Sequence, residues 1–245
     1  MNIKTYADSN SLANAFAGDL VDLLKSLIEQ QDTVTVALSG GSTPQLLFKI
    51  LAEKFAGEVN WKKVHFYWGD ERSVPPTDAE SNFGVANRLL LSRVDVPAAN
   101  IHRIEGESNP TDEIERYREL ILETIERDNS GKPAFDVMML GIGNDGHTAS
   151  IFPHQMEFLD SKNVCEIATH PLSGQKRITV TGSVINASRN VFFLVAGDSK
   201  SNVLAEIVEQ TGSFRSYPAS FVAPSGELWF YTDQAAASKL RDNRR

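Results

Sequence analysis

The sequence predicts an α/β fold: a doubly wound, mainly parallel sheet with helices on both faces and a smaller region of mixed sheet. First, segments of strand character alternate with amphipathic helical segments along most of the 245 residues. Second, the segment FDVMML (135–140) is apolar apart from Asp136, as is usual for a parallel strand covered on both faces. Third, some late strand candidates follow one another too closely for a helical crossover, which predicts the mixed region.

The amino-terminal half supplies strands and helices in alternation. Leucine and phenylalanine recur at helical spacing over residues 12–27, which predicts an amphipathic first helix. TVTVAL (33–38) is a short β-branched strand, and QLLFKILAEKF (45–55) is the helix that follows it. VHFYWG (64–69) is another strand, and a helix begins near Ser81, whose hydroxyl is suited to cap it.

The second half continues this alternation within what we expect to be one domain over residues 1–245. Residues 111–128 form a helix with acidic residues in its first turn and Thr111 as its N-cap. Residues 199–210 form another helix, and residues 233–240 form a short last one. The strand candidates in this half are 135–140, 163–169, 177–182, 191–196 and 227–232.

Composition narrows the classes of function. The net charge of -8 comes from 32 acidic and 24 basic side chains, which argues against nucleic acid or anionic membranes as partners. Cys165 is the single cysteine, so the chain can form neither an intrachain disulfide nor a thiolate metal cluster. The sequence shows neither a signal-like amino terminus nor an 18-residue apolar run, and we expect a cytoplasmic protein.

Ligands of doubly wound sheets bind beyond the carboxyl ends of the strands, so the loops there are the candidate sites. The loop after residues 33–38 holds two glycines, three hydroxyl residues and then Pro44 at the start of a helix. Free N–H groups at a helix start bind phosphate, although a tight turn with hydroxyl caps is an equal alternative. It is not a P-loop, because no Gly-Lys-Ser/Thr follows. The candidate phosphate residues are Ser39, Gly40, Gly41, Ser42 and Thr43.

Charged residues follow two other strands. Asp70 and Arg72 come directly after residues 64–69, where they form either a solvated turn or a carboxylate beside an anion-binding arginine. Lys200 opens the helix after residues 191–196, where a cation is unfavourable unless it faces an anion. Lys176 and Arg177 precede another strand, and these cations could equally be surface charge.

The segment LGIGNDGHTASIFP contains a literal G-x-G-x-x-G motif, which is a weak signal of dinucleotide binding. The motif requires a helix that begins at its third glycine, but Pro153 leaves room for at most two turns after Gly146. We therefore expect no nicotinamide dinucleotide. The loop does offer His147 as a general base with Asp145 to orient it, or else a hydrogen-bonded structural histidine. His154 is close enough to be held in reserve, and zinc is not expected without further ligands at suitable spacing.

Taken together, the loops resemble the 6-phosphogluconolactonase family over nearly the whole chain. The motifs occur in one order: LSGGSTP, WGDERSVPPTDAESNFGVANRLLL, LGIGNDGHTASIFP, RITVTGSVINASRNVFFLVAGDSKSNVL and PASFVAPSGELWFYTDQAAA. The resemblance implies a doubly wound sheet with a smaller appended sheet, shared with amino-sugar-phosphate deaminases. It also implies hydrolysis of 6-phosphoglucono-δ-lactone in the pentose phosphate pathway, with no metal or organic cofactor. The expected partner is this small substrate, and the protein is expected to be a monomer or homodimer.

The resemblance also implies roles for the candidate residues. Ser39 to Thr43 would lie beside the sugar phosphate, with Lys200 and Arg177 completing the charge clamp. His147 would deprotonate a water molecule, supported by Asp145, while Asp70 and Arg72 would line the reacting end. Arg72 or a backbone N–H of residues 141–147 would stabilise the oxyanion.

Two positions depart from the family pattern. The segment THPLSGQKR (169–177) is less proline-rich than expected, which leaves open whether Lys176 or Arg177 reaches the phosphate. His154 occupies a position where the family pattern leads us to expect a small residue.

Two rival functions use related folds. A glucosamine-6-phosphate deaminase/isomerase would place a glutamate shortly after the Asp-Gly-His motif, but Phe152 occupies the matching position. A non-catalytic sugar-phosphate-sensing domain would carry a helix-turn-helix extension. The expectation here is instead that the chain begins directly with its first domain helix.

Overall fold

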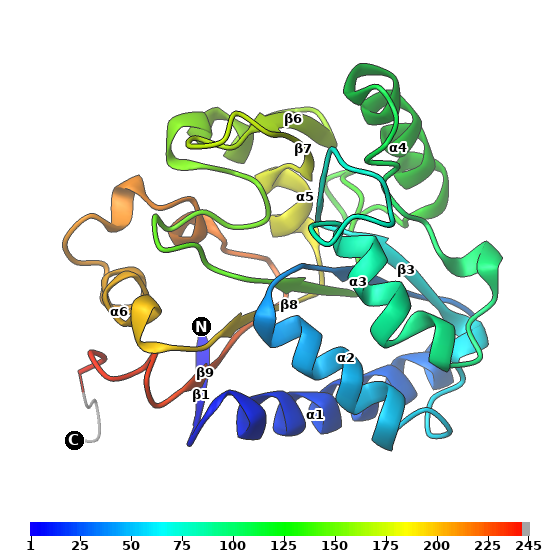
Figure 1. The fold of residues 1–245 in the computed structure, drawn as a ribbon, viewed down its shortest axis with the longest axis horizontal. Coiled ribbons are helices and arrows are strands. Elements are labelled where there is room, and N and C mark those ends of the chain that lie inside the picture. Colours follow the sequence, from blue (N-terminus) through cyan, green and yellow to red (C-terminus); the bar gives the residue numbers. More distant parts are fainter. Residues whose placement is uncertain (242–245) are drawn as a thin grey trace.

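The computed structural model describes residues 1–241, and a six-stranded sheet forms its centre (Figure 1). All neighbouring strands in this sheet pair in parallel. Their order across the sheet is β1 (Asn2–Tyr6), β9 (Glu227–Asp233), β8 (Asn190–Val195), β5 (Val137–Leu140), β2 (Val34–Leu38) and β3 (Val64–Trp68). The prediction of a mainly parallel sheet is therefore confirmed.

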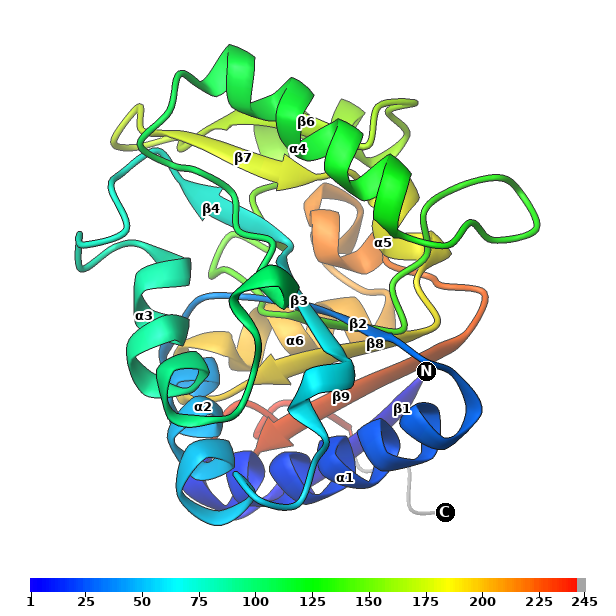
Figure 2. The ribbon, with the colours of Figure 1, turned by 90° about the vertical axis from the view of Figure 1, so that its right-hand side faces the viewer.

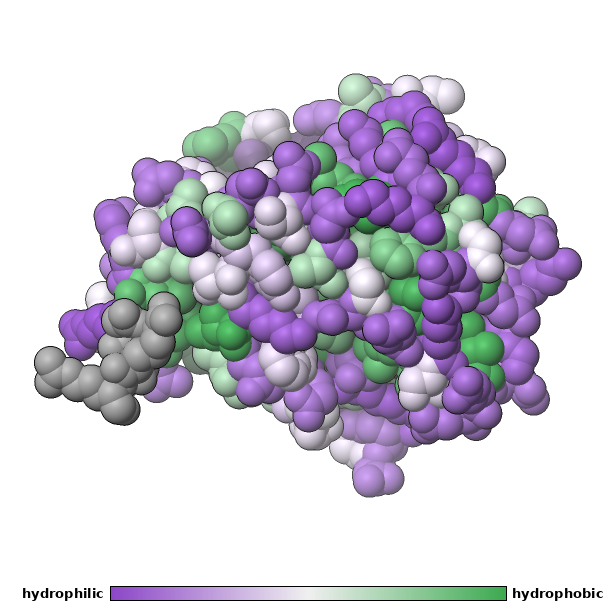
Figure 3. All heavy atoms as spheres, turned by 90° about the horizontal axis from the view of Figure 1, so that it is seen from below, coloured by the Kyte–Doolittle hydropathy of each residue, from purple (hydrophilic) through white to green (hydrophobic). Residues whose placement is uncertain are grey.

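Helices cover both sides of this sheet, as the pattern predicts. α1 (Ser9–Gln30) and α2 (Ser42–Lys54) lie against one face, below the sheet in Figure 1. The apolar stripe of α1 reaches the sheet through Phe16, whose ring contacts Phe192 and Tyr231 with centroids 5.1 and 4.8 Å away. Hydrophilic residues cover most of the outer face on this side (Figure 3). The remaining helices are α3 (Asn82–Leu89), α4 (Pro110–Thr124), α5 (Gly182–Ala187) and α6 (Ser201–Glu209).

A second, smaller sheet lies on the opposite side of the large sheet from α1 (Figures 1 and 2). Its three antiparallel strands occur in the order β4 (Asp70–Arg72), β7 (Lys176–Val180) and β6 (Cys165–Thr169), and α4 packs on it. This is the smaller sheet region that the short connections predict. The idea of a solvated turn at Asp70 is wrong, because this residue lies in β4 with a relative exposure of 4%.

Three local predictions are wrong, each for a tertiary reason. Residues 2–6 form β1 and pair with β9, so the described chain begins with a strand and not with a helix. Within the predicted helix 233–240, Asp233 ends β9 and residues 234–239 form consecutive turns, while the Asp233 carboxylate accepts from the N–H groups of Ala236 and Gly197. α4 is capped by Asn109, whose Oδ1 accepts from the N–H of Thr111, because Pro110 takes the first helical position.

The topology of the large sheet places a crevice between β2 and β5. β2 pairs with β3 on one side and with β5 on the other, and the later strands β8 and β9 add beyond β5. β2 and β5 share only the pairs Val36–Val137 and Ala37–Met138, so their ladder stops before both strands end. Such a reversal of strand order is where doubly wound sheets bind ligands. Among the described residues, no helix is both long and apolar enough to cross a membrane.

Candidate active site

A cavity of about 240 Å³ opens at the carboxyl ends of these strands. This volume is small beside the roughly 300–1,000 Å³ usual for ligand pockets, which favours a compact ligand. Loops after β2, β5 and β8 contribute to its wall, as the sequence predicts, and β4, which follows β3, contributes Asp70 and Arg72. The predicted site residues that line it are Ser39, Gly40, Gly41, Ser42, Thr43, Asp70, Arg72, His147, Arg177 and Lys200. Asp145 stands behind His147, outside this lining.

The loop after β2 presents backbone N–H groups to the cavity. Gly41 has a φ of 112°, which only glycine adopts readily, and α2 begins immediately after it. Among the described residues, no side-chain hydrogen bond caps this helix, so the hydroxyl-capped turn is not what forms. A Cβ at Gly40 would lie 1.9 Å from Oδ1 of Asn82, so this position requires glycine. The result is an uncapped helix start that suits an anion.

Two half-buried cations face the same space. The Nζ of Lys200 donates to Oδ1 of Asn144 at 2.6 Å, and burial lowers the pKa of this amine. The guanidinium of Arg177 lies 5.6 Å from the ring centroid of Phe152, and burial and the charge of Arg72 lower its pKa. Both lowered pKa values indicate that the positive charge is only partly balanced by neighbouring negative charge. A bound anion would supply the missing negative charge. A local positive site is thus present in a chain of net charge -8.

The structure separates the two adjacent cations of β7. Alternate residues of a strand face opposite sides, so Lys176 and Arg177 diverge. Lys176 is exposed and its Nζ donates to Oγ1 of Thr169, outside the cavity lining. Arg177 is the one that lines the cavity.

His147 and Asp145 are in direct contact. The Nδ1 of His147 lies 2.6 Å from Oδ1 of Asp145. Burial alone would raise the pKa of Asp145, but the hydrogen bond to His147 and its charge outweigh burial and lower the pKa to about 2. An ionised carboxylate accepts the Nδ1 proton, which leaves Nε2 of a neutral His147 as the hydrogen-bond acceptor. The pair therefore has the tautomer that a general base needs.

Gly143 and Gly146 are required by the conformation of this loop. A Cβ at Gly143 would lie 2.0 Å from Nδ1 of His147, so a side chain there would displace the ring. Gly146 has a φ of 79°, and a Cβ there would lie 2.4 Å from the ring of Tyr217. No α-helix begins at Gly146, and the next helical segment is a 3₁₀ stretch at Pro153–Leu159. This geometry differs from that of a dinucleotide fingerprint.

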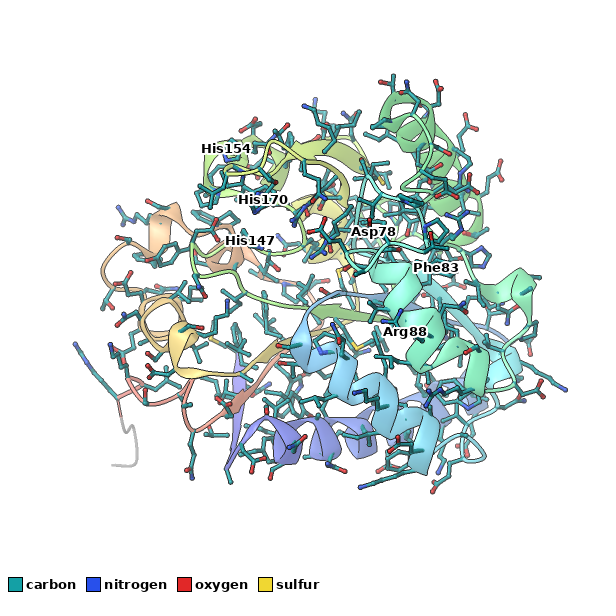
Figure 4. All side chains as sticks on the ribbon, viewed as in Figure 1. Asp78, Phe83, Arg88, His147, His154 and His170 are labelled. Carbon is teal, nitrogen blue, oxygen red and sulfur yellow. The ribbon has the colours of Figure 1, made fainter. Side chains whose placement is uncertain are left out.

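An aromatic residue packs against the ring of His147. The buried ring of Phe152 packs on His147 with centroids 4.8 Å apart, and it also contacts His154 and His170. Figure 4 shows these three histidines on the same side of the molecule. His154 is exposed and lines an outer groove of about 700 Å³ beside the cavity, so the reserve candidate lies outside the cavity lining.

The short strand β4 contributes buried polar groups that sequence reasoning missed. Glu71 accepts hydrogen bonds from the N–H groups of Asn82 and Phe83 and from the hydroxyl of Ser81, which anchors the start of α3. Burial raises the pKa of Glu71, although these bonds oppose the shift. Arg72 donates through Nη1 to the carbonyl of Glu80, while its buried Nε has no hydrogen-bond partner among residues 1–241. A buried donor without a partner beside a cavity is available to a ligand.

Comparisons with known proteins agree with this geometry. Residues 7–230 match the family model described as glucosamine-6-phosphate isomerases/6-phosphogluconolactonase. A 6-phosphogluconolactonase of Haemophilus influenzae is 46% identical over 209 residues, covering 84% of this chain and 88% of the relative. The crystal structure of the devB protein is 41% identical, with a TM-score of 0.91 over 98% of this chain and 99% of that one. The 6-phosphogluconolactonase of Trypanosoma brucei is 26% identical, with a TM-score of 0.88 over 98% of both chains. The chain belongs to the glucosamine-6-phosphate isomerase/6-phosphogluconolactonase family.

Proposed function

We propose that this protein is an enzyme that hydrolyses 6-phosphoglucono-δ-lactone to 6-phosphogluconate in the pentose phosphate pathway, with residues 1–245 acting as one domain. One observation supports this proposal most strongly. His147, which contacts Asp145, lines the same cavity as the uncapped start of α2 and the cations Lys200 and Arg177. The name of the Haemophilus influenzae relative supports the lactone as substrate. A monomeric glucosamine-6-phosphate deaminase is 20% identical and shares the fold alone.

Several groups that line the cavity suit the phosphate. The backbone of Ser39 to Thr43 offers N–H groups, and Lys200 and Arg177 supply charge. Charge-assisted hydrogen bonds of this kind are stronger than neutral ones and fix the position of the bound group. Holding the remote phosphate would place the lactone carbonyl beside His147 and so lower the entropic cost of the reaction.

Other groups that line the same cavity suit the reacting carbon. His147 takes a proton from a water molecule through Nε2, and the water oxygen attacks the lactone carbonyl carbon. A donor must then stabilise the oxyanion, and we assign this role to Arg72 or to a backbone N–H of residues 141–147. When the intermediate collapses, the bond to the ring oxygen breaks and that oxygen takes the proton from His147. Asp145 holds the imidazolium in place, and Asp70 lines the same cavity.

The first test is turnover of freshly prepared 6-phosphoglucono-δ-lactone, corrected for spontaneous opening, with the unphosphorylated lactone in parallel. We expect Lys200→Gln to raise KM for the phosphorylated lactone about 10- to 100-fold, the scale of a hydrogen bond to a charged group. KM for the unphosphorylated lactone should change little.

Lys176→Gln is the matched control, because this neighbouring lysine lies outside the cavity lining. It should behave as the wild type. A folded wild type that does not accelerate lactone opening would contradict the proposal, and release of ammonia from glucosamine 6-phosphate would then indicate the deaminase.

A further inference from the structure

We infer that Ser150 is a positioning residue that fixes the Asp70 carboxylate relative to His147, a role that rests on the proposed lactonase function. The Oγ of Ser150 donates to Oδ2 of Asp70 at 2.7 Å, between residues 80 positions apart in the chain. Ser150 follows His147 by three residues, and Asp70 lines the cavity from β4. This hydrogen bond therefore joins the loop of the proposed base to β4 of the small sheet.

Burial makes the bond well placed to orient the carboxylate. Ser150 has a relative exposure of 0% and Asp70 one of 4%, so bulk water competes little for either group. The other side of Asp70 faces Asn82, whose Nδ2 donates to the Asp70 carbonyl at 2.9 Å and lies 3.5 Å from its Oδ1. Ser150 consequently makes the shorter side-chain contact to this carboxylate and determines how it is turned.

Ser150 is itself held from two directions. Its N–H donates to Oγ1 of Thr179, and Thr179 is the residue of β7 that pairs with Asp70 in the small sheet. The preceding residue, Ala149, has a φ of 47°, a left-handed conformation that is uncommon outside glycine, and it lines the cavity. Such a conformation persists where the surroundings enforce it. The loop is thus clamped to the small sheet at the point where Ser150 meets Asp70.

This clamp predicts a specific kinetic effect. Without the hydroxyl, the buried carboxylate loses a charge-assisted hydrogen bond and is free to turn within the cavity wall. The glycine loop, Lys200 and Arg177 remain in place, so substrate binding should survive. We therefore expect a loss in kcat and not in KM.

The experiment is a double-mutant cycle with Ser150→Ala and Asp70→Asn, measured as kcat and KM on 6-phosphoglucono-δ-lactone. Ser150→Ala should lower kcat about 10- to 100-fold, the range expected for a hydrogen bond to a charged group, with KM within about threefold. In the Asp70→Asn background the same change should lower kcat less than about threefold further, because the two residues act as a unit. Ser188→Ala is the matched control: Ser188 is also fully buried, and its hydroxyl donates to the Val184 carbonyl in α5.

The outcomes separate this inference from the proposed function. Wild-type activity with an unchanged kcat in Ser150→Ala would overturn the positioning role alone, and so would losses that multiply independently with Asp70→Asn. An inactive wild type would overturn the lactonase and this role together. If Ser150→Ala does not fold, Ser150→Cys replaces it, because a thiol fills the space while donating only weakly, and the same loss in kcat is expected.

Discussion

Two pairs of side chains in this protein each place a histidine nitrogen against a second polar group. In one, Nδ1 of His147 lies 2.6 Å from the Asp145 carboxylate. In the other, Nδ1 of His65 lies 3.0 Å from Nε2 of His102. The first pair stands at the cavity, whereas neither member of the second lines it.

The partner decides what each imidazole can do. His65 and His102 share at most one proton between the facing nitrogens, and their rings stack at a centroid distance of 5.2 Å. His102 also stacks on Tyr67 at 4.4 Å. Burial and the neighbouring His65 lower the pKa of His102 to about 4, and burial lowers that of His65. This pair therefore packs in the neutral form, whereas the Asp145 carboxylate gives the ring of His147 a hydrogen-bond acceptor that orients it.

The largest effect on turnover should come from replacing one histidine of each pair in separate variants. His147→Gln should lower kcat/KM on the phosphorylated lactone by roughly 10²- to 10⁴-fold, because a positioned general base contributes on that scale. His102→Phe keeps an aromatic ring over Tyr67 and should leave turnover within about twofold, since surface and packing changes remote from a site rarely reach the chemistry. Steady-state kinetics on both folded variants checks this. If His147→Gln and His102→Phe lose kcat/KM equally, the His147–Asp145 pair has no catalytic role that the His65–His102 pair lacks.

A smaller effect should follow from changing the partner of His147. Asp145→Asn preserves the shape of the side chain but removes the charge that a pKa of about 2 maintains. We expect kcat to fall about 10-fold with KM nearly unchanged, because the half-exposed carboxylate is partly replaced by water. Asp128→Asn is the control, since Asp128 also accepts backbone N–H groups but lies in the turn at residues 128–132. If the Asp145 and Asp128 variants are equally active, the carboxylate does not support the base.

Features encoded in neighbouring residues could be predicted from the sequence. The apolar run of β5, the glycines after β2 and the Ser81 cap of α3 are local, and the structure has all three. Their physical causes act over a few residues, through burial on both faces, backbone freedom and helix capping. The site loops could be located for the same reason, because they follow predicted strands.

Features that depend on distant pairing could not be predicted in this way. β1 has a mostly exposed, polar sequence and becomes a strand because β9 pairs with it from more than 200 residues away. Glu71 appears in the sequence as an exposed charge, yet it is 2% exposed because the N-terminal N–H groups of α3 satisfy it. Similarly, no local pattern links Ser150 to Asp70. Each of these contacts exists only once the chain has folded.

The smallest effect concerns stability, and it tests the second pair. The pKa of His102 is about 4 when folded, below its ordinary value of 6.5, so the unfolded chain binds more protons between these pH values. Stability should therefore be fully present above pH 6.5 and decline as the pH falls towards 4. His102→Phe should reduce this decline by on the order of 1 kcal/mol, a value discounted because the ring is half exposed. Urea unfolding at several pH values measures it. His147→Gln is the control: it keeps the His65–His102 pair, so its free energy of unfolding should depend on pH as in the wild type. If His102→Phe also shows the wild-type dependence, the His65–His102 pair does not cause the loss of stability in acid.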